Sequence, residues 1–216
     1  MLEQYRTVYE GGEGEITEKK SRFIATVHPV ESEEEALAFL EEMKKKYWDA
    51  RHNCYAYILG DNNEVQRFSD DGEPSGTAGK PILEVITGNE CSNCLCVVTR
   101  YFGGVLLGIG GLIRAYTNAA KDALDNSRTG TLTDGTHAFI DADYNYVGKI
   151  QHICAQNEIT IVDTVYAENV SFELMLEQQK ENMLEKKITE LSSGTLKLRD
   201  VSHIKMYRDE EGMLTV

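Results

Sequence analysis

The sequence lacks the long apolar segments that mark membrane and secreted proteins. No apolar run approaches the roughly 18 residues that a membrane-spanning helix needs. The first residues, 1–6, also lack the apolar core of a signal peptide. These absences predict a cytoplasmic protein with no membrane partner.

Basic charge is also scarce. Residues 1–134 carry 14 Lys+Arg against 22 Asp+Glu, and residues 135–216 carry 8 against 14, so neither half of this chain of net charge -14 is basic. Bulk attraction to nucleic acid is therefore disfavoured. Any such binding requires a local basic patch, for which Arg51, Lys80, Arg100 and Arg114 are the candidates.

Paired cysteines are missing too. The chain has five cysteines, an odd number, which favours reduced thiols over a disulfide framework. Cys91 and Cys94 have the spacing of a metal-binding pair, but no second pair follows. Cys94 and Cys96 lie two residues apart in an apolar run. We predict small buried thiols, no metal and no cofactor.

Hydrophobic periodicity predicts the elements of the first half. A capping box at Ser32 and Glu35 begins a helix whose apolar face includes Ala36 and Leu40. The remaining predictions are strands at 22–30, 54–59, 64–68 and 94–100, a helical turn within 78–86 and an amphipathic helix from Leu112 to Leu124.

The second half follows a polar stretch, 126–135, that is typical of a linker. The predicted order is strand 136–142, helix 145–156, strand 160–165, strand 169–176, helix 179–191 and strand 195–207. This β-α-β-β-α-β order is that of a ferredoxin-like fold. We therefore predict two domains, 1–134 and 135–216, and expect the second to fold by itself.

An acidic loop lies at residues 69–81. Its candidate functional residues share carboxylate or hydroxyl oxygens and are Asp70, Asp71, Glu73, Ser75 and Thr77. Such oxygens are suitable ligands for Mg²⁺, although the spacing is not that of an EF-hand. The sequence leaves open whether the loop binds a metal or has a structural role.

A glycine-rich loop connects the strand at 94–100 to the helix that follows. Its glycines include Gly103, Gly104, Gly110 and Gly111. Bare backbone N–H groups at a helix N-terminus bind anions, but the spacing matches neither a Walker A loop nor a dinucleotide fingerprint. The alternative is that the glycines only allow a tight turn.

Arg100 and Arg114 flank this loop. They either bind phosphate or pair with the acids of the acidic loop and so lock the two loops together. We predict on grounds of charge that the acidic and glycine-rich loops meet. The candidates for binding an anion or RNA are Arg100, Tyr101, Gly103, Gly104, Gly110, Gly111, Arg114 and Lys80. No catalytic residue is predicted, because His52 and Cys54 have no orienting third group.

The motifs resemble those of the IMPACT family, in its bacterial YigZ/YvyE-like branch. The matching stretches are Arg-His-Asn-Cys-Tyr-Ala-Tyr at 51–57, Ser-Asp-Asp-Gly-Glu-Pro-Ser-Gly-Thr-Ala-Gly at 69–79, Val-Thr-Arg-Tyr-Phe-Gly-Gly at 98–104 and Gly-Gly-Leu-Ile-Arg-Ala-Tyr at 110–116. The resemblance covers residues 20–124 strongly and the remainder only by its layout.

The resemblance implies an α+β protein with two domains. The first would be an α/β sandwich similar to the second domain of the small-subunit ribosomal protein five, and the second a ferredoxin-like domain similar to one of elongation factor G. Eukaryotic relatives regulate translation by binding a protein partner of a stress kinase. We expect a regulator of translation or of a stress response that binds RNA, the ribosome or a translation-associated protein, with weak, salt-sensitive association. The alternative is an enzyme that acts on a phosphorylated small molecule or nucleotide at the two loops.

Overall fold

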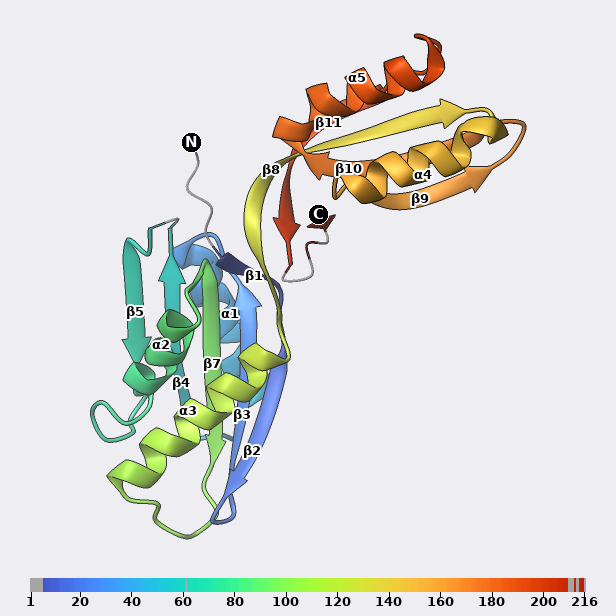
Figure 1. Ribbon diagram of the computed structural model, residues 1–216. Coiled ribbons are helices and arrows are strands. Elements are labelled where there is room, and N and C mark those ends of the chain that lie inside the picture. Colours follow the sequence, from blue (N-terminus) through green and yellow to red (C-terminus); the bar gives the residue numbers. More distant parts are fainter. Residues whose placement is uncertain (1–5, 61, 210–211, 213, 216) are drawn as a thin grey trace. The chain divides into compact units, whose positions relative to one another are not determined.

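The computed structural model describes residues 6–60, 62–209, 212 and 214–215 (Figure 1). The chain divides into two compact units, and the boundary in the sequence lies between Thr131 and Leu132. This boundary lies three residues before the predicted one. Each unit has a hydrophobic core of its own.

A five-stranded sheet forms the centre of the first unit. Its strands, in spatial order, are β2 (Glu13–Glu18), β3 (Ser21–Pro29), β7 (Cys94–Tyr101), β4 (His52–Leu59) and β5 (Val65–Ser69). All neighbouring pairs are antiparallel. The predicted strands are confirmed within two residues at each end, whereas the polar strand β2 was not predicted.

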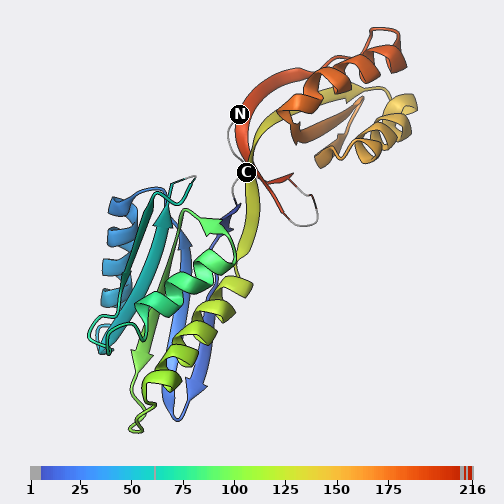
Figure 2. The ribbon, with the colours of Figure 1, turned by 60° about the vertical axis from the view of Figure 1, so that its left-hand side comes forward.

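Helices cover both faces of this sheet, as Figure 2 shows. Helix α1 (Glu33–Lys46) packs on one face, against Leu95 and Val97 of β7. Helices α2 (Gly79–Gly88) and α3 (Ile109–Asp125) pack on the other face. Because side chains alternate along a strand, successive residues of β7 enter different cores.

The start of α1 confirms Ser32 as the capping residue, since its hydroxyl accepts a hydrogen bond from the Glu35 N–H at 3.2 Å. The predicted capping box differs in its second half. The Glu35 carboxylate accepts from the N–H of Glu31 at 2.7 Å, one residue before the expected donor. Both bonds still satisfy backbone donors at the helix N-terminus.

Residues 126–135 contain the boundary between the two units, but most of them form a strand rather than the polar loop that was predicted. Strand β8 runs from Arg128 to Ala142, so most of that stretch is extended and paired. Its first residues pair antiparallel with β1 (Arg6–Glu10), which also pairs with the short β6 (Cys91–Ser92). Polar threonines and glycines suggested a loop, but ladder partners distant in sequence hold them in a strand.

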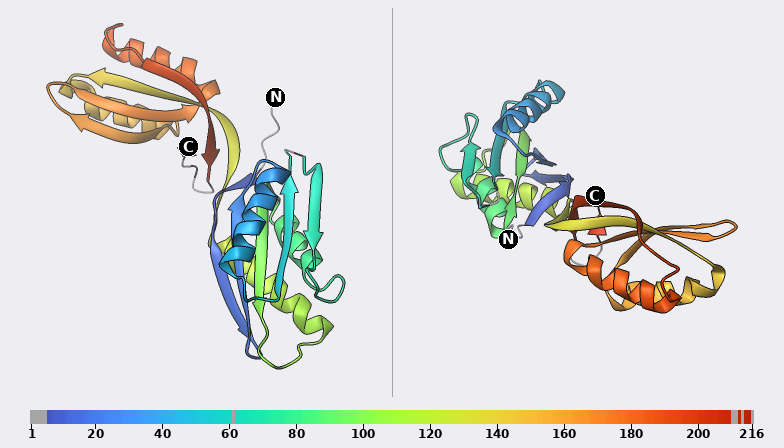
Figure 3. Two further views of the ribbon diagram at one scale, coloured as in Figure 1. Left: turned by 180° about the vertical axis from the view of Figure 1, so that it is seen from behind. Right: turned by 90° about the horizontal axis from the view of Figure 1, so that it is seen from above.

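The second unit has the predicted β-α-β-β-α-β order. After β8 come the short helix η1 (Tyr144–Tyr146), α4 (Val147–Gln156), β9 (Thr160–Tyr166), β10 (Val170–Glu177), the short helix η2 (Gln178–Lys180), α5 (Glu181–Ser192), β11 (Arg199–Arg208) and β12 (Leu214–Thr215). The spatial order is β12-β11-β8-β10-β9. Helices α4 and α5 lie on one face of the sheet (Figure 3), and their apolar residues form its core with β10.

All five cysteines are reduced and buried, as predicted. Burial raises the pKa of the Cys96 thiol to about 12 and that of Cys154 to about 11. A thiol with so high a pKa forms little thiolate at neutral pH and reacts slowly.

The connections at one end of the first unit bring the sequence motifs together. They are the β2–β3 turn at 19–20, the α1–β4 connection at 47–51, the β5–α2 loop at 70–78 and the β7–α3 loop at 102–108. We call this set of four connections the loop end. Side-chain hydrogen bonds link these connections to neighbouring strand ends, for example the bond from the Tyr101 hydroxyl, at the end of β7, to Asp49.

Candidate functional site

Asp70 organises the acidic loop from within. One carboxylate oxygen accepts from the N–H of Gly76 at 2.8 Å, and the other accepts from Ala78 at 3.0 Å and Gly79 at 2.9 Å. The last two donors belong to the first turn of α2, which has no other side-chain cap. Asp70 thus caps this helix from nine residues away.

Substitution of Asp70 tests this capping role. We expect Asp70→Ala to lower the free energy of unfolding by about 1–2 kcal/mol, because three backbone donors lose a charged acceptor. The control is Asp122→Ala, whose exposed carboxylate accepts a single backbone N–H, from Glu15. Equal losses in urea denaturation of the two variants would contradict the role.

The stability difference between wild type and Asp70→Asn should depend on pH. Partial burial opposes ionisation, yet the N–H donors of Gly76, Gly79 and Ala78 hold the pKa of Asp70 below its usual 3.8. The carboxylate therefore stabilises the folded state above about pH 4, and this contribution is lost as pH falls through the lower, folded-state pKa. A constant difference between pH 7 and pH 2 would contradict this assignment.

Asp71 joins the same loop to strand β4. Its carboxylate accepts from the Asn53 N–H at 2.6 Å, and its carbonyl oxygen lies 2.8 Å from Nδ1 of His52. The residue adopts φ +41°, a left-handed conformation that aspartate tolerates better than most residues, and Gly72 follows at +85°. Both the carboxylate and the backbone carbonyl of Asp71 therefore accept hydrogen bonds from strand β4.

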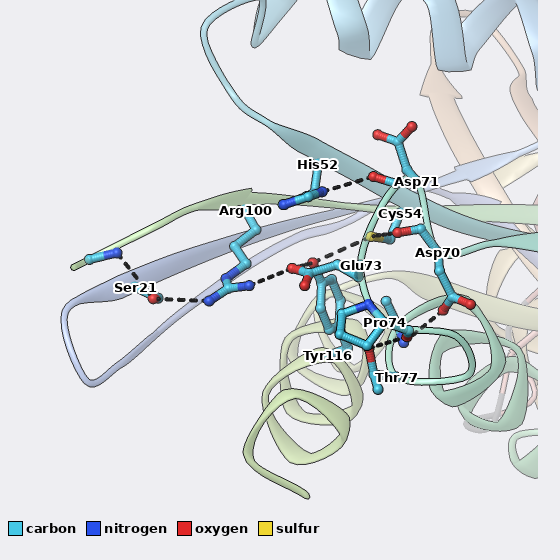
Figure 4. Close-up of polar contacts among 12 residues, drawn as sticks. Ser21, His52, Cys54, Asp70, Asp71, Glu73, Pro74, Thr77, Arg100 and Tyr116 are labelled. Carbon is cyan, nitrogen blue, oxygen red and sulfur yellow. Dashed lines mark hydrogen bonds and ion pairs between the residues drawn. The ribbon is translucent and has the colours of Figure 1, made fainter. Parts of the chain in front are cut away.

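Glu73 and Arg100 form a buried ion pair between the two loops (Figure 4). The Nη1 of Arg100 lies 2.5 Å from Oε1 of Glu73, and both side chains are less than a tenth exposed. The hydroxyl of Tyr116, on α3, donates to the same oxygen at 2.8 Å. Charge-assisted bonds at this depth are strong and sensitive to the loss of either partner.

The arginine also contacts the β2–β3 turn and the glycine-rich loop. Its Nη2 donates to the Ser21 hydroxyl at 3.5 Å, and that oxygen accepts from the N–H of Gly103 at 3.1 Å. Its guanidinium lies 5.4 Å from the ring centre of Phe23 and 5.6 Å from that of Phe102. Arg100 thus holds three connections in one arrangement.

The predicted meeting of the two loops is confirmed by the ion pair. The prediction that Arg100 offers its charge to an external anion is wrong, since this residue is only 6% exposed and faces Glu73. Tyr116 is fully buried as well and packs edge-on against Phe23, 5.1 Å between ring centres. The pairing alternative was the correct one for Arg100.

The thiol nearest this network is not poised for catalysis. The Cys54 sulfur lies 3.0 Å from the carbonyl oxygen of Asp70 and 3.3 Å from the Tyr116 hydroxyl, and its single S–H can donate to either. Burial raises the pKa of this thiol far above its usual value. His52, two residues away, has its Nδ1 engaged by Asp71. The arrangement therefore supplies no thiolate for nucleophilic attack.

The glycine-rich loop exposes apolar side chains and backbone donors. Leu106 is 84% exposed and Ile109 66%. Gly108, at φ +73°, precedes α3, whose N-terminus has no side-chain cap. The N–H groups of Gly110 and Gly111 therefore remain open to a ligand at this helix end.

The other predicted residues differ in what they offer. Arg114 is exposed and has no ion-pair partner among the described residues, whereas Lys80 lies 3.9 Å from Glu84. Ser75 is exposed, and the Thr77 hydroxyl donates to the Pro74 carbonyl. Gly104, at φ +84°, has open space around it. Arg114, the partly exposed Tyr101 and the exposed residues of the loop 102–108 are thus available to a partner.

One prominent residue of the loop end was not singled out from the sequence. Trp48, in the α1–β4 connection, is 82% exposed. Its position directly after three lysines and a tyrosine was the available signal.

The fold and the interlocked loops define a two-domain α+β protein. The Impact N-terminal domain matches residues 19–124, and a Domain of unknown function (DUF1949) matches residues 140–195. The chain is 40% identical over 214 residues to the IMPACT family member YvyE of Bacillus subtilis, covering 95% of this chain and 99% of that one. It is 36% identical over 182 residues to the IMPACT family member YigZ of Escherichia coli (strain K12), covering 83% and 89%. The chain therefore belongs to the IMPACT family.

A solved structure agrees with this result. The crystal structure of a hypothetical protein matches with a TM-score of 0.60 and 34% identity, over 92% of this chain and 97% of that one. Within the described residues, no helix is both long and apolar enough to cross a bilayer.

Proposed function

We propose that this protein is a cytosolic regulator of translation or of a stress response, and that it acts by binding at its loop end. The resemblance to the IMPACT family supplies the link to translation. The binding role is supported by how the motif residues are used. The acids and Arg100 hold the loops together, whereas apolar and cationic side chains of the motifs remain exposed on the surface.

The internal contacts argue against the enzymatic alternative. A catalytic or metal site needs acids that are available to a ligand. Here the carboxylates of Asp70, Asp71 and Glu73 accept hydrogen bonds from the protein itself. No group of three or more metal-ligating side chains occurs among the residues that the structure describes.

The outer surface supports binding to a large partner. Leu106 and Ile109 project from the glycine-rich loop, and Arg114 stands on the next turn of α3. No acidic residue occurs between Arg100 and Lys121, in a chain whose net charge is -14. An exposed apolar patch with a cationic border is typical of an interaction surface.

Cosedimentation of the full chain with purified bacterial ribosomes tests the proposal. We expect binding that weakens as the salt concentration rises from about 50 to about 200 mM, because only a few phosphate contacts are available. The double variant Leu106→Ser/Arg114→Ala should bind roughly fivefold or more weakly, since it removes an apolar anchor and a charge. The matched control is Lys186→Ala, an exposed lysine of the second unit.

Two results would overturn the proposal. One is the absence of wild-type protein from the ribosomal pellet at low salt. The other is retention of the Leu106→Ser/Arg114→Ala variant at the wild-type level, which would place the contact on another face.

A further inference from the structure

Trp48 is much more exposed than a large apolar side chain usually is. It is the only tryptophan of the chain and is 82% exposed. Its ring contacts no other ring or cation, and its indole N–H has no acceptor among the described residues. A side chain with so much apolar area normally packs or binds a partner.

The connection that carries Trp48 is held in place at three points. The N–H of Tyr47 donates to the Met43 carbonyl at 2.9 Å and closes α1, and the N–H of Ala50 donates back to the Tyr47 carbonyl at 2.9 Å. The Tyr101 hydroxyl donates to Asp49 at 2.7 Å. Trp48 therefore projects from an ordered turn, so that little conformational freedom remains to be lost on binding.

Basic residues lie on both sides of Trp48 in the sequence. Lys45 precedes Trp48 by three residues and Arg51 follows it by three, and both are exposed without an ion-pair partner among the described residues. Tyr47 and Tyr101 are half-exposed beside them. An exposed aromatic ring with cations three residues away on each side in the sequence has the composition of a site for a nucleic-acid base and its phosphates.

Two acids in this neighbourhood form ion pairs with cations. Glu13 pairs with Lys46 at 3.0 Å, and Glu15 pairs with Arg22 at 2.5 Å. The carboxylate of Asp49 accepts from Tyr101. Lys45 and Arg51 remain as cations without an ion-pair partner among the described residues, next to the Asp49 carboxylate, whose hydrogen-bond donor is a neutral hydroxyl.

We propose that Lys45, Trp48 and Arg51 form a binding site for single-stranded RNA. The indole of Trp48 stacks on an unpaired base, and the two cations contact the neighbouring phosphates. This inference rests on the proposed function and deepens it by naming the class of partner. Single-stranded RNA fits better than a protein here because exposed cations lie near Trp48 in the sequence on both sides, whereas the exposed aliphatic side chains lie on the glycine-rich loop.

Fluorescence of the single tryptophan tests this site directly. The full chain is titrated with an oligouridine of about 12 nucleotides, a length within the usual site size for such surfaces. Base stacking should quench Trp48 emission in a saturable manner. A hairpin RNA with the same number of nucleotides, whose bases are paired, should quench much less.

Variants separate stacking from charge, with affinity measured by anisotropy of a labelled oligouridine. Trp48→Ala should bind roughly tenfold more weakly and Trp48→Phe less so, because phenylalanine keeps a stacking face. Lys45→Ala/Arg51→Ala should lower the slope of affinity against salt concentration, while Lys186→Ala should not. Circular dichroism checks that each variant is folded.

The outcomes distinguish this inference from the proposed function. Unchanged Trp48 emission on addition of oligouridine, or equal affinity of Trp48→Ala and wild type, overturns the RNA site even if ribosomes still bind. Loss of ribosome binding in Trp48→Ala without any quenching by oligouridine assigns the residue to a protein contact and also overturns it. Quenching without ribosome binding supports the RNA site and removes the proposed function.

Discussion

Replacement of Arg100 by alanine should lower the free energy of unfolding by about 3–5 kcal/mol. The change leaves the Glu73 carboxylate buried with only the Tyr116 hydroxyl as a partner, and an unpaired buried charge is costly. Urea denaturation at neutral pH measures the loss. Arg114→Ala, on the exposed side of α3, should change the stability by less than about 0.5 kcal/mol.

The double variant Glu73→Gln/Arg100→Met provides the decisive control. Removal of both charges should restore much of the stability lost in Arg100→Ala, because no ionised group then remains unpaired in the interior. If Arg100→Ala and Arg114→Ala prove equally stable, the ion pair does not hold the loops. In that case Arg100 is again open to a role in binding.

Substitution of Gly103 by alanine should cost about 1–3 kcal/mol, as insertion of a methyl group into a packed region does. A Cβ at this position would lie 2.0 Å from the carbonyl carbon of Lys20 and 2.4 Å from the nitrogen of Ser21, which are backbone atoms. The β2–β3 turn must therefore move. Since Ser21 also accepts from Gly103 and from Arg100, the movement would disturb the ion pair as well.

Gly110→Ala is the matched control in the same loop segment. The nearest atom to its added Cβ is the end of the Arg114 side chain at 3.8 Å, and the residue lies in the first turn of α3. We expect this variant to be as stable as wild type or up to about 1 kcal/mol more stable. Equal thermal and urea stability of Gly103→Ala and Gly110→Ala would show that the β2–β3 turn accommodates the methyl group.

Elements with a regular apolar pattern were predictable from the sequence, and those held by distant partners were not. The amphipathic helices and the apolar strand β7 were found within two or three residues. Strand β2, Glu-Gly-Glu-Ile-Thr-Glu, has a single large apolar residue and lies at a sheet edge, so no pattern marks it. The first half of β8 was hidden by its turn-forming composition.

The position of Arg100 could have been deduced from the strand that contains it. Side chains alternate along β7, so Arg100 shares a face with Cys96 and Val98 and enters the same core. The sequence correctly predicted that opposite charges join the two loops. It did not show which acid pairs with Arg100, because that choice depends on the path of the loop around Asp70.

The burial of all five cysteines has a practical consequence for work with this protein. Thiol reagents should leave the folded native chain almost unlabelled, because every sulfur is shielded and the thiolate is scarce. One cysteine introduced at an exposed position such as Ser75 would then be the single reactive handle. Dyes or spin labels can be attached there without first removing the native cysteines from the two cores.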